Sequence, residues 1–68
     1  MSRKETREIM SKFLAKEEAE VAEDLEKRGK TGNEAKFIAD QHRLTLSEIA
    51  TEAGFPEIAQ EYRRKIGD

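Results

Sequence analysis

The sequence predicts an all-α protein: a small bundle of three to four helices, one long at the N-terminus and the others shorter, joined by short turns in a single domain over residues 1–68. Three observations predict this fold class. Hydroxyl residues stand three positions before a Glu at the expected helix starts, as in a capping box. Apolar residues recur at helical spacing. Charged residues make up 41% of the chain while the net charge is only −2, which is typical of helices with many salt bridges.

The first helix is expected at residues 3–28. Ser2 and Glu5 match a capping box, and Lys27 and Arg28 suit the negative end of the helix dipole. Gly29 is expected to end this helix in the left-handed conformation. Its large apolar residues are Ile9, Met10, Phe13, Leu14, Val21 and Leu25. A helix of this length spans roughly 39 Å, more than the three short helices of this chain cover. We therefore expect another chain to cover part of this stripe.

The second and third helices are expected at residues 33–43 and 46–53. A capping-box pattern opens each of them, formed by the pairs Thr31 with Glu34 and Thr45 with Glu48. Leu44 and Ile49 are placed as a hydrophobic staple at the start of the third helix. The pattern therefore predicts a break in the helix between residues 43 and 46.

The fourth helix is expected at residues 56–66. Gly54 is expected to end the preceding helix in the left-handed conformation and to turn Phe55 back onto it, and Pro56 suits the first position of the next helix. The apolar face of this helix consists of Ile58, Ala59, Tyr62 and Ile66. The preceding short helix has a similar face made of Leu46, Ile49, Ala50 and Ala53.

The sequence offers no chemistry that indicates an enzyme. It has no cysteine, a single histidine, no glycine-rich phosphate loop and no nucleophile elbow. We therefore expect a non-catalytic protein without a cofactor. No apolar run reaches the length of a membrane span, and no hydrophobic signal segment is present, so we expect a cytoplasmic protein with no membrane contact.

A metal site is also not expected. Glu17, Glu20 and Asp24 fall on one side of the first helix, and with His42 they resemble the carboxylate–histidine ligands of ferritin-type bundles. Those bundles require a Glu three residues before the His, where this chain has Ala39. We interpret Glu17 as a residue at an interface edge, paired with a basic residue or with Tyr62, and His42 as a residue in the last turn of the second helix.

The charges of the first helix are divided along its length. Residues 1–16 hold five basic and two acidic residues, whereas residues 17–26 hold six acidic residues and no basic one. One interpretation is a solvated face with pairs four residues apart, which would be Lys16–Glu20, Glu23–Lys27 and Asp24–Arg28. The other is complementarity between two antiparallel helices, the basic half of one meeting the acidic half of the other.

The leading hypothesis is a protein-interaction or regulatory module that binds another protein chain through apolar helix faces. The expected partner-binding residues are Phe13, Leu14, Glu17, Val21, Leu25 and Phe37. The expected partner is a second copy, in an antiparallel homodimer through the long first helix. Such a pairing would bring Arg3, Arg7 and Lys12 of one copy near Glu20, Asp24 and Glu26 of the other.

The alternative is a small DNA-associated regulator that uses the helices at 46–53 and 56–66. Residues 46–55 resemble the first half of a helix-turn-helix motif. The second half departs from the motif at Gln60 and Arg63, where apolar residues are usual, and places Glu57 and Glu61 where phosphates would repel them. The basic residues Arg63, Arg64 and Lys65 could contact a phosphate. Their place at the C-terminus of a helix, where the dipole favours cations, explains them without one.

Overall fold

The computed structural model describes residues 2–67, and within them it contains helices and no strand. The helices are α1 (Arg3–Lys27), α2 (Gly32–Glu52) and α3 (Pro56–Lys65). The all-α class is confirmed. The three helices of residues 2–67 also lie within the expected three to four. The contrast between one long helix and several short ones is weaker than expected, because α2 has 21 residues against 25 in α1, and only α3, with 10 residues, is short.

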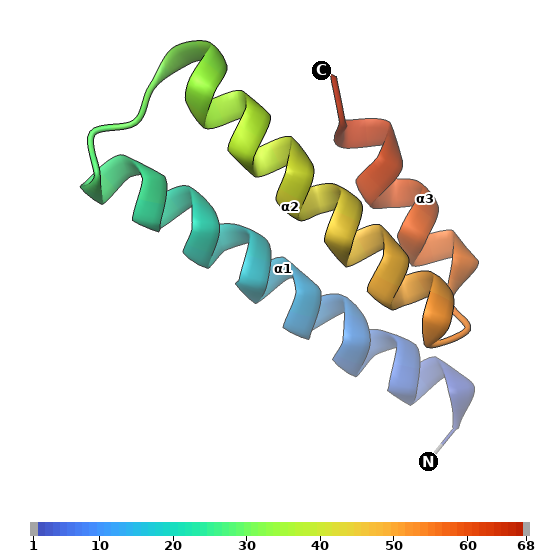
Figure 1. Cartoon of the computed structure of the whole chain (residues 1–68). Coiled ribbons are helices and arrows are strands. Elements are labelled where there is room, and N and C mark those ends of the chain that lie inside the picture. The colour runs from blue at the N-terminus through green and yellow to red at the C-terminus, as the bar shows by residue number, and fades with distance from the viewer. Residues whose placement is uncertain (1, 68) are drawn as a thin grey trace.

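The first two helices form an antiparallel hairpin, and α3 turns back along the C-terminal half of α2 (Figure 1). The molecule is elongated, with dimensions of 41 × 20 × 16 Å. Because α3 is less than half as long as α2, the three helices lie together only at the end of the hairpin that holds the N-terminus. None of the three helices has the length and apolar character needed to cross a membrane.

Both ends of α1 follow the sequence prediction. The Glu5 amide donates to Ser2 Oγ at 3.2 Å, and the Ser2 amide donates to Glu5 Oε1 at 3.4 Å, which completes the capping box. At the other end Gly29 takes the left-handed conformation, with a φ of 71°, and the Lys30 amide donates to the Leu25 carbonyl at 2.9 Å. These bonds satisfy backbone groups that a helix end leaves unpaired.

The capping box expected at Thr31 is not formed. Thr31 is the N-cap residue of α2, but its side chain accepts no hydrogen bond from the helix. Gly32 follows with a φ of 62°. The Glu34 carboxylate pairs with Lys30 Nζ at 2.7 Å instead of reaching back to the cap.

The break expected between residues 43 and 46 is wrong, because α2 continues through it. The Thr45 hydroxyl donates to the Gln41 carbonyl at 3.2 Å, one turn back in the same helix, and so caps nothing. No glycine or proline lies in this stretch to end the helix. Leu46 and Ala50, which are 1% and 0% exposed, instead hold one side of the continuous helix in the core.

The corner between α2 and α3 is built as the sequence predicts. Gly54 has a φ of 86°. Its amide donates to the Thr51 carbonyl at 3.0 Å, and the Phe55 amide donates to the Ala50 carbonyl at 2.9 Å, the two bonds of a Schellman motif. The turn brings Phe55 back into the core beside Ala50. Pro56 then begins α3, where its missing amide hydrogen leaves no helical bond unmade.

The hydrophobic core lies at the end of the hairpin that α3 joins. Its buried members come from all three helices and the corner: Leu14, Leu46, Ala50, Phe55, Ile58, Ala59 and Tyr62. The buried face predicted for the last helix is confirmed, with Ile66 half-buried at its end. Ile49 and Ala53, expected to share the buried face of the preceding segment, are exposed. Leu25, near the tip of the hairpin, is buried outside this cluster.

A cluster of charges joins the three helices where α3 ends. Arg43 Nε donates to Glu18 Oε2 at 2.8 Å, and Arg43 Nη1 donates to Asp40 Oδ1 at 2.9 Å. Lys65 Nζ donates to Glu18 Oε1 at 3.1 Å, and the Gly67 amide donates to Asp40 Oδ2 at 3.2 Å. Burial alone would raise the pKa of the Glu18 carboxyl, but hydrogen bonds and positive charge from Arg43 and Lys65 outweigh it and lower that pKa.

Candidate functional site: an apolar groove between α1 and α2

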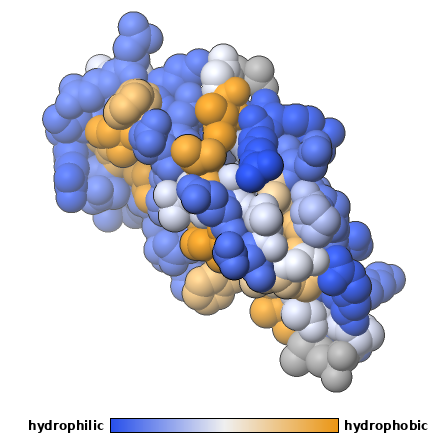
Figure 2. All heavy atoms as spheres, turned by 45° about the vertical axis from the view of Figure 1, so that its right-hand side comes forward, coloured by the Kyte–Doolittle hydropathy of each residue, from blue (hydrophilic) through white to orange (hydrophobic). Residues whose placement is uncertain are grey.

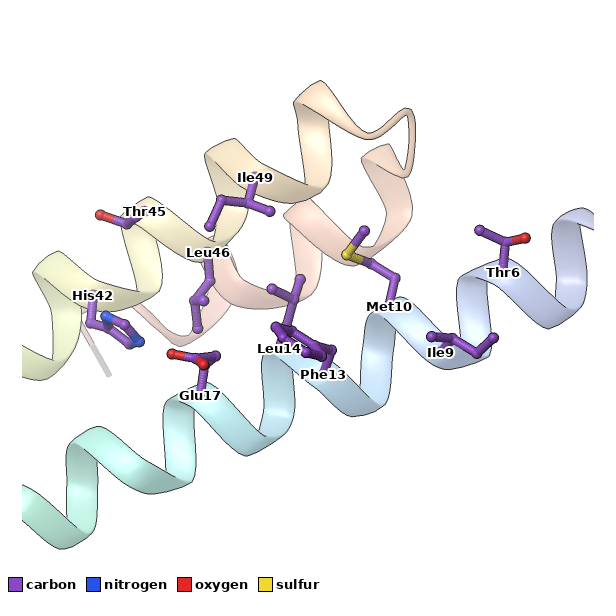
Figure 3. A pocket seen from close by; sticks show the side chains of 10 residues that line it. All are labelled: Thr6, Ile9, Met10, Phe13, Leu14, Glu17, His42, Thr45, Leu46 and Ile49. Atoms are coloured by element: carbon purple, nitrogen blue, oxygen red, sulfur yellow. The ribbon is translucent and has the colours of Figure 1, made fainter.

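One face of the hairpin carries an open groove of about 430 Å³ between α1 and α2 (Figure 3). Its surface is almost wholly apolar. The residues that line it are Thr6, Ile9, Met10, Phe13, Leu14 and Glu17 from α1, and His42, Thr45, Leu46 and Ile49 from α2. No described residue of α3 lines it, so the groove belongs to the hairpin alone.

The groove has a buried floor and an exposed rim. Leu14 and Leu46 form the floor, at 2% and 1% exposure, and both also belong to the core. Ile9, Phe13 and Ile49 form the rim and are 54%, 63% and 44% exposed. The floor is therefore fixed by the packing of the fold, whereas the rim holds large apolar side chains that the described chain leaves in contact with water.

The sequence places these residues by helical spacing. In α1 the lining residues Thr6, Ile9, Phe13 and Glu17 follow one another at intervals of three or four. In α2 His42, Thr45 and Ile49 do the same. Residues three and four apart share one face of a helix, so each helix contributes a continuous edge to the groove.

His42 stands in the interior of α2, so its predicted place in the last turn of a helix is wrong. The dipole argument for it fails because α2 continues for ten residues beyond it, to Glu52. The ring is half-buried, and its Nε2 atom is buried with no hydrogen-bond partner among residues 2–67. A buried polar atom without a partner lowers the stability of a fold. In Figure 3 the ring extends from α2 toward α1, near Glu17.

Glu17 is half-buried and lines the groove, and its place at an interface edge stays a prediction. The predicted pairing with a base or tyrosine is absent within residues 2–67, where its neighbour Glu18 holds the ion pairs instead. The reason is that Glu18 faces Arg43 and Lys65, whereas Glu17 is turned toward the groove. The described residues contain no group of three histidine or carboxylate side chains arranged to hold a metal ion.

The expected partner-binding residues fall into three groups. Phe13 and Glu17 line the groove, and Val21 lies half-buried beyond it. Leu14 and Leu25 are buried within the chain, at 2% and 7% exposure. Phe37 is 65% exposed but does not line this groove or the depressions next to it. The structure thus gathers three of the six in the groove, because Leu14, although buried, belongs to its floor beside Phe13 and Glu17. All six remain a prediction as partner contacts.

Sequence reasoning did not select Ile9, Thr45 or Ile49 as site residues. Ile9 and Phe13 lie one turn apart, which is a signal the sequence contains. The signal in α2 is hidden, because a helix starting at 46 separates Ile49 from His42. Treating residues 38–49 as one helix would have shown Ile38, His42, Thr45 and Ile49 on a single face.

The groove continues toward the tip of the hairpin. A second depression of about 370 Å³ shares His42 and Thr45 with it. Its other lining residues are Val21, Asp24, Leu25, Arg28, Lys30, Ile38 and Gln41. This extension is more polar, and its charged groups are paired: Arg28 with Asp24 at 3.1 Å and Lys30 with Glu34 at 2.7 Å.

The charges of α1 follow the solvated-face interpretation in part. The Glu23–Lys27 and Asp24–Arg28 pairs are formed at 3.1 Å each, whereas no Lys16–Glu20 pair is present in the described chain. These pairs are exposed and contribute little to stability.

Arg3, expected to meet a second copy, is engaged within its own chain. Its Nη2 donates to the Gly54 carbonyl at 2.8 Å and lies 3.5 Å from Glu57 Oε1, and its guanidinium lies 4.7 Å from the centre of the Phe55 ring. The N-terminus of α1 is thereby fastened to the corner between α2 and α3.

Comparison of the chain with protein-family models, with curated proteins and with solved structures finds no match.

Proposed function

We propose that this chain is a non-catalytic protein-interaction or accessory module that binds a helix of another protein chain in the groove between α1 and α2. The observation that carries the proposal is the rim of three large apolar side chains, Ile9, Phe13 and Ile49, around an apolar floor. Figure 2 shows one face of the molecule, on which hydrophilic side chains predominate and hydrophobic groups form separate patches. A groove bounded by apolar residues is typical of a surface that another chain covers.

A helix fits the shape of this groove. Two antiparallel helices with lining residues three and four apart form a seam of the kind that accepts a third helix, as in a helical bundle. Covering the exposed parts of Ile9, Phe13 and Ile49 would contribute about 3 kcal/mol, at roughly 1 kcal/mol for each half-exposed side chain. Association itself offsets much of such a gain, so we expect weak, micromolar binding unless polar contacts add to it.

The proposal is tested first with the protein alone, because a second copy is a partner that needs no other component. Sedimentation at about 100 μM compares wild type with two matched variants, Phe13→Glu and Phe37→Glu. Phe13 and Phe37 have nearly equal exposure, 63% and 65%, but only Phe13 borders the groove. A dimer that Phe13→Glu dissociates and Phe37→Glu preserves supports binding through the groove.

The second arm uses a displayed library of helical peptides, selected on wild type. We expect the selected helices to lose binding to Phe13→Glu and to Ile49→Glu and to keep it to Phe37→Glu. The proposal is contradicted if wild type is monomeric and the library yields no helix that depends on Phe13. Circular dichroism serves as the folding control for each variant.

A further inference from the structure

The exposed face of α1 changes character along its length. Its first half lines the groove with Thr6, Ile9 and Phe13, and its second half places carboxylates on the same side. Glu17 lines the groove, Asp24 lines the extension, and Glu20 lies between them at helical spacing. A helix lying along α1 would thus meet apolar side chains first and carboxylates one to two turns later.

The groove and its extension together are long enough for such a helix. They share His42 and Thr45 and run from Thr6 to Arg28 along α1. Twenty-two residues of α-helix span roughly 33 Å. An occupant of this length can therefore contact the apolar rim and reach Glu17 and Glu20 on α1 at the same time.

Two of these carboxylates have no counter-charge in their own chain. Asp24 is paired with Arg28 at 3.1 Å. Neither Glu17 nor Glu20 has an ion-pair or hydrogen-bond partner among residues 2–67. Glu17 is also half-buried beside Phe13 in the groove.

We infer that the groove takes a basic amphipathic helix of another protein. Large apolar side chains one turn apart on that helix would pack between Ile9, Phe13 and Ile49. A Lys or Arg one to two turns further along would lie next to Glu17 and Glu20 and pair with them. The inference rests on the proposed function and specifies its partner by charge as well as by shape.

A second copy of this chain supplies no such charges along the groove. If two α1 helices paired in parallel, Glu17 and Glu20 of one copy would face those of the other, and like charges repel. If they paired antiparallel with the apolar halves in contact, the carboxylates of each copy would face the region around Thr6 and Ile9 of the other. In the antiparallel arrangement Arg3 is held by Gly54 and Glu57 of its own chain, and Arg7 and Lys12 lie about 100–120° around α1 from Thr6. Neither arrangement therefore places a cation directly opposite Glu17, which favours a foreign basic helix as the occupant.

The inference can be tested with synthetic helices of defined charge. Two peptides of about 18 residues carry Leu at the same helical positions, with the flanking positions filled by Lys in one and by Glu in the other. Fluorescence anisotropy measures their dissociation constants for wild type at low salt and at about 0.15 M salt. We expect the Lys peptide to bind about tenfold more tightly at low salt, and the ratio to shrink as salt rises.

Charge variants show whether the preference comes from the groove. In the double variant Glu17→Gln with Glu20→Gln, we expect the ratio of the two dissociation constants to fall severalfold toward one, the value for a surface without charge. The control is Glu26→Gln with Glu61→Gln, which changes the net charge equally at two exposed positions outside the groove and its extension. It should keep most of the preference for the Lys peptide.

The outcomes separate this inference from the proposed function. Equal binding of the two peptides, or equal effects of the two double variants, overturns the inference about charge. If Phe13→Glu still abolishes binding in that case, the groove remains a helix-binding site. If Phe13→Glu leaves the binding of both peptides unchanged, the proposed function fails as well. A wild-type dimer that excludes the Lys peptide overturns the inference in favour of a second copy.

Discussion

The two ends of the hairpin are stabilised in different ways. At the N-terminal end three helices meet, and residues such as Leu46 and Tyr62 are buried in one cluster at 1% and 4% exposure. At the tip only two helices are present, and Leu25 is buried alone among exposed ion pairs. Exposed pairs add little to stability, whereas buried apolar area adds much. The cooperative part of this fold is therefore the end that α3 covers.

The largest expected effect is a loss of stability from a substitution in the well-packed end. Leu46→Ala removes a side chain that is both core and groove floor, and we expect it to lower the free energy of unfolding by about 3–4 kcal/mol. Leu25→Ala, the matched substitution at the tip, should lower it by about 2 kcal/mol, because the surrounding side chains are more exposed and can relax. Urea unfolding followed by circular dichroism measures both. Equal losses would show that the two ends are equally important for stability.

The next effect concerns the two turns that end α1 and α2. Gly54 and Gly29 both have positive φ angles, 86° and 71°, and no atom lies within 4 Å of a Cβ added at either position. A β-branched residue resists this conformation, so we expect Gly54→Val to lower stability by about 2 kcal/mol. Gly29→Val should strain its own turn to a similar degree but affect only the tip. Hydrogen exchange would then show faster opening near residues 25–35 in Gly29→Val and faster global opening in Gly54→Val.

The ionic cluster between the two ends makes stability depend on pH. The pKa of Glu18 is lowered in the folded chain, so its contribution is complete above the ordinary glutamate pKa of about 4.3 and is lost as pH falls through the folded value. We expect Glu18→Gln to lower stability by about 1–2 kcal/mol at pH 7 and to match wild type below the folded pKa. Glu17→Gln, the neighbouring control, should change stability at pH 7 by less than about 0.5 kcal/mol. A constant difference between Glu18→Gln and wild type from pH 7 to 3 would contradict this role.

The smallest expected effect lies in the groove. His42→Leu replaces a half-buried ring whose Nε2 has no hydrogen-bond partner, so we expect stability to rise by about 1 kcal/mol. Thermal unfolding measures the change. A gain would identify His42 as a residue kept for something other than the stability of the isolated chain. A loss would show that the ring packs better than its unpaired nitrogen suggests.

Much of this fold was predictable from local sequence. Ser2 with Glu5, Gly29, Gly54 and Pro56 were each expected to begin or end a helix, and each does so. These signals are reliable because they act through backbone geometry and the hydrogen bonds of adjacent residues. The buried face of α3 was predictable for a similar reason, since a short amphipathic helix has only one face to bury.

The groove was less predictable. The capping pattern at Thr45 indicated a helix start, but hydroxyl groups inside a helix are satisfied equally well by the carbonyl one turn back. Thr45 can either cap a new helix or lie inside a longer one. The outcome depends on whether Leu46 and Ala50 pack on the same side as the turns before them, which is a property of the whole fold. The wrong break then hid Ile49 as a neighbour of His42.

The sequence by itself determined the helical class, the ends of α1 and α3 and the lack of a known catalytic motif, because these follow from residues within a few positions of one another. Tertiary structure decided that α2 is continuous, that Glu18 rather than Glu17 holds the ion pairs, and that Leu14 lies in the floor while Phe13 stands on the rim. Neighbouring positions on a helix differ by about 100°, so which of them is buried depends on where the other helices pack.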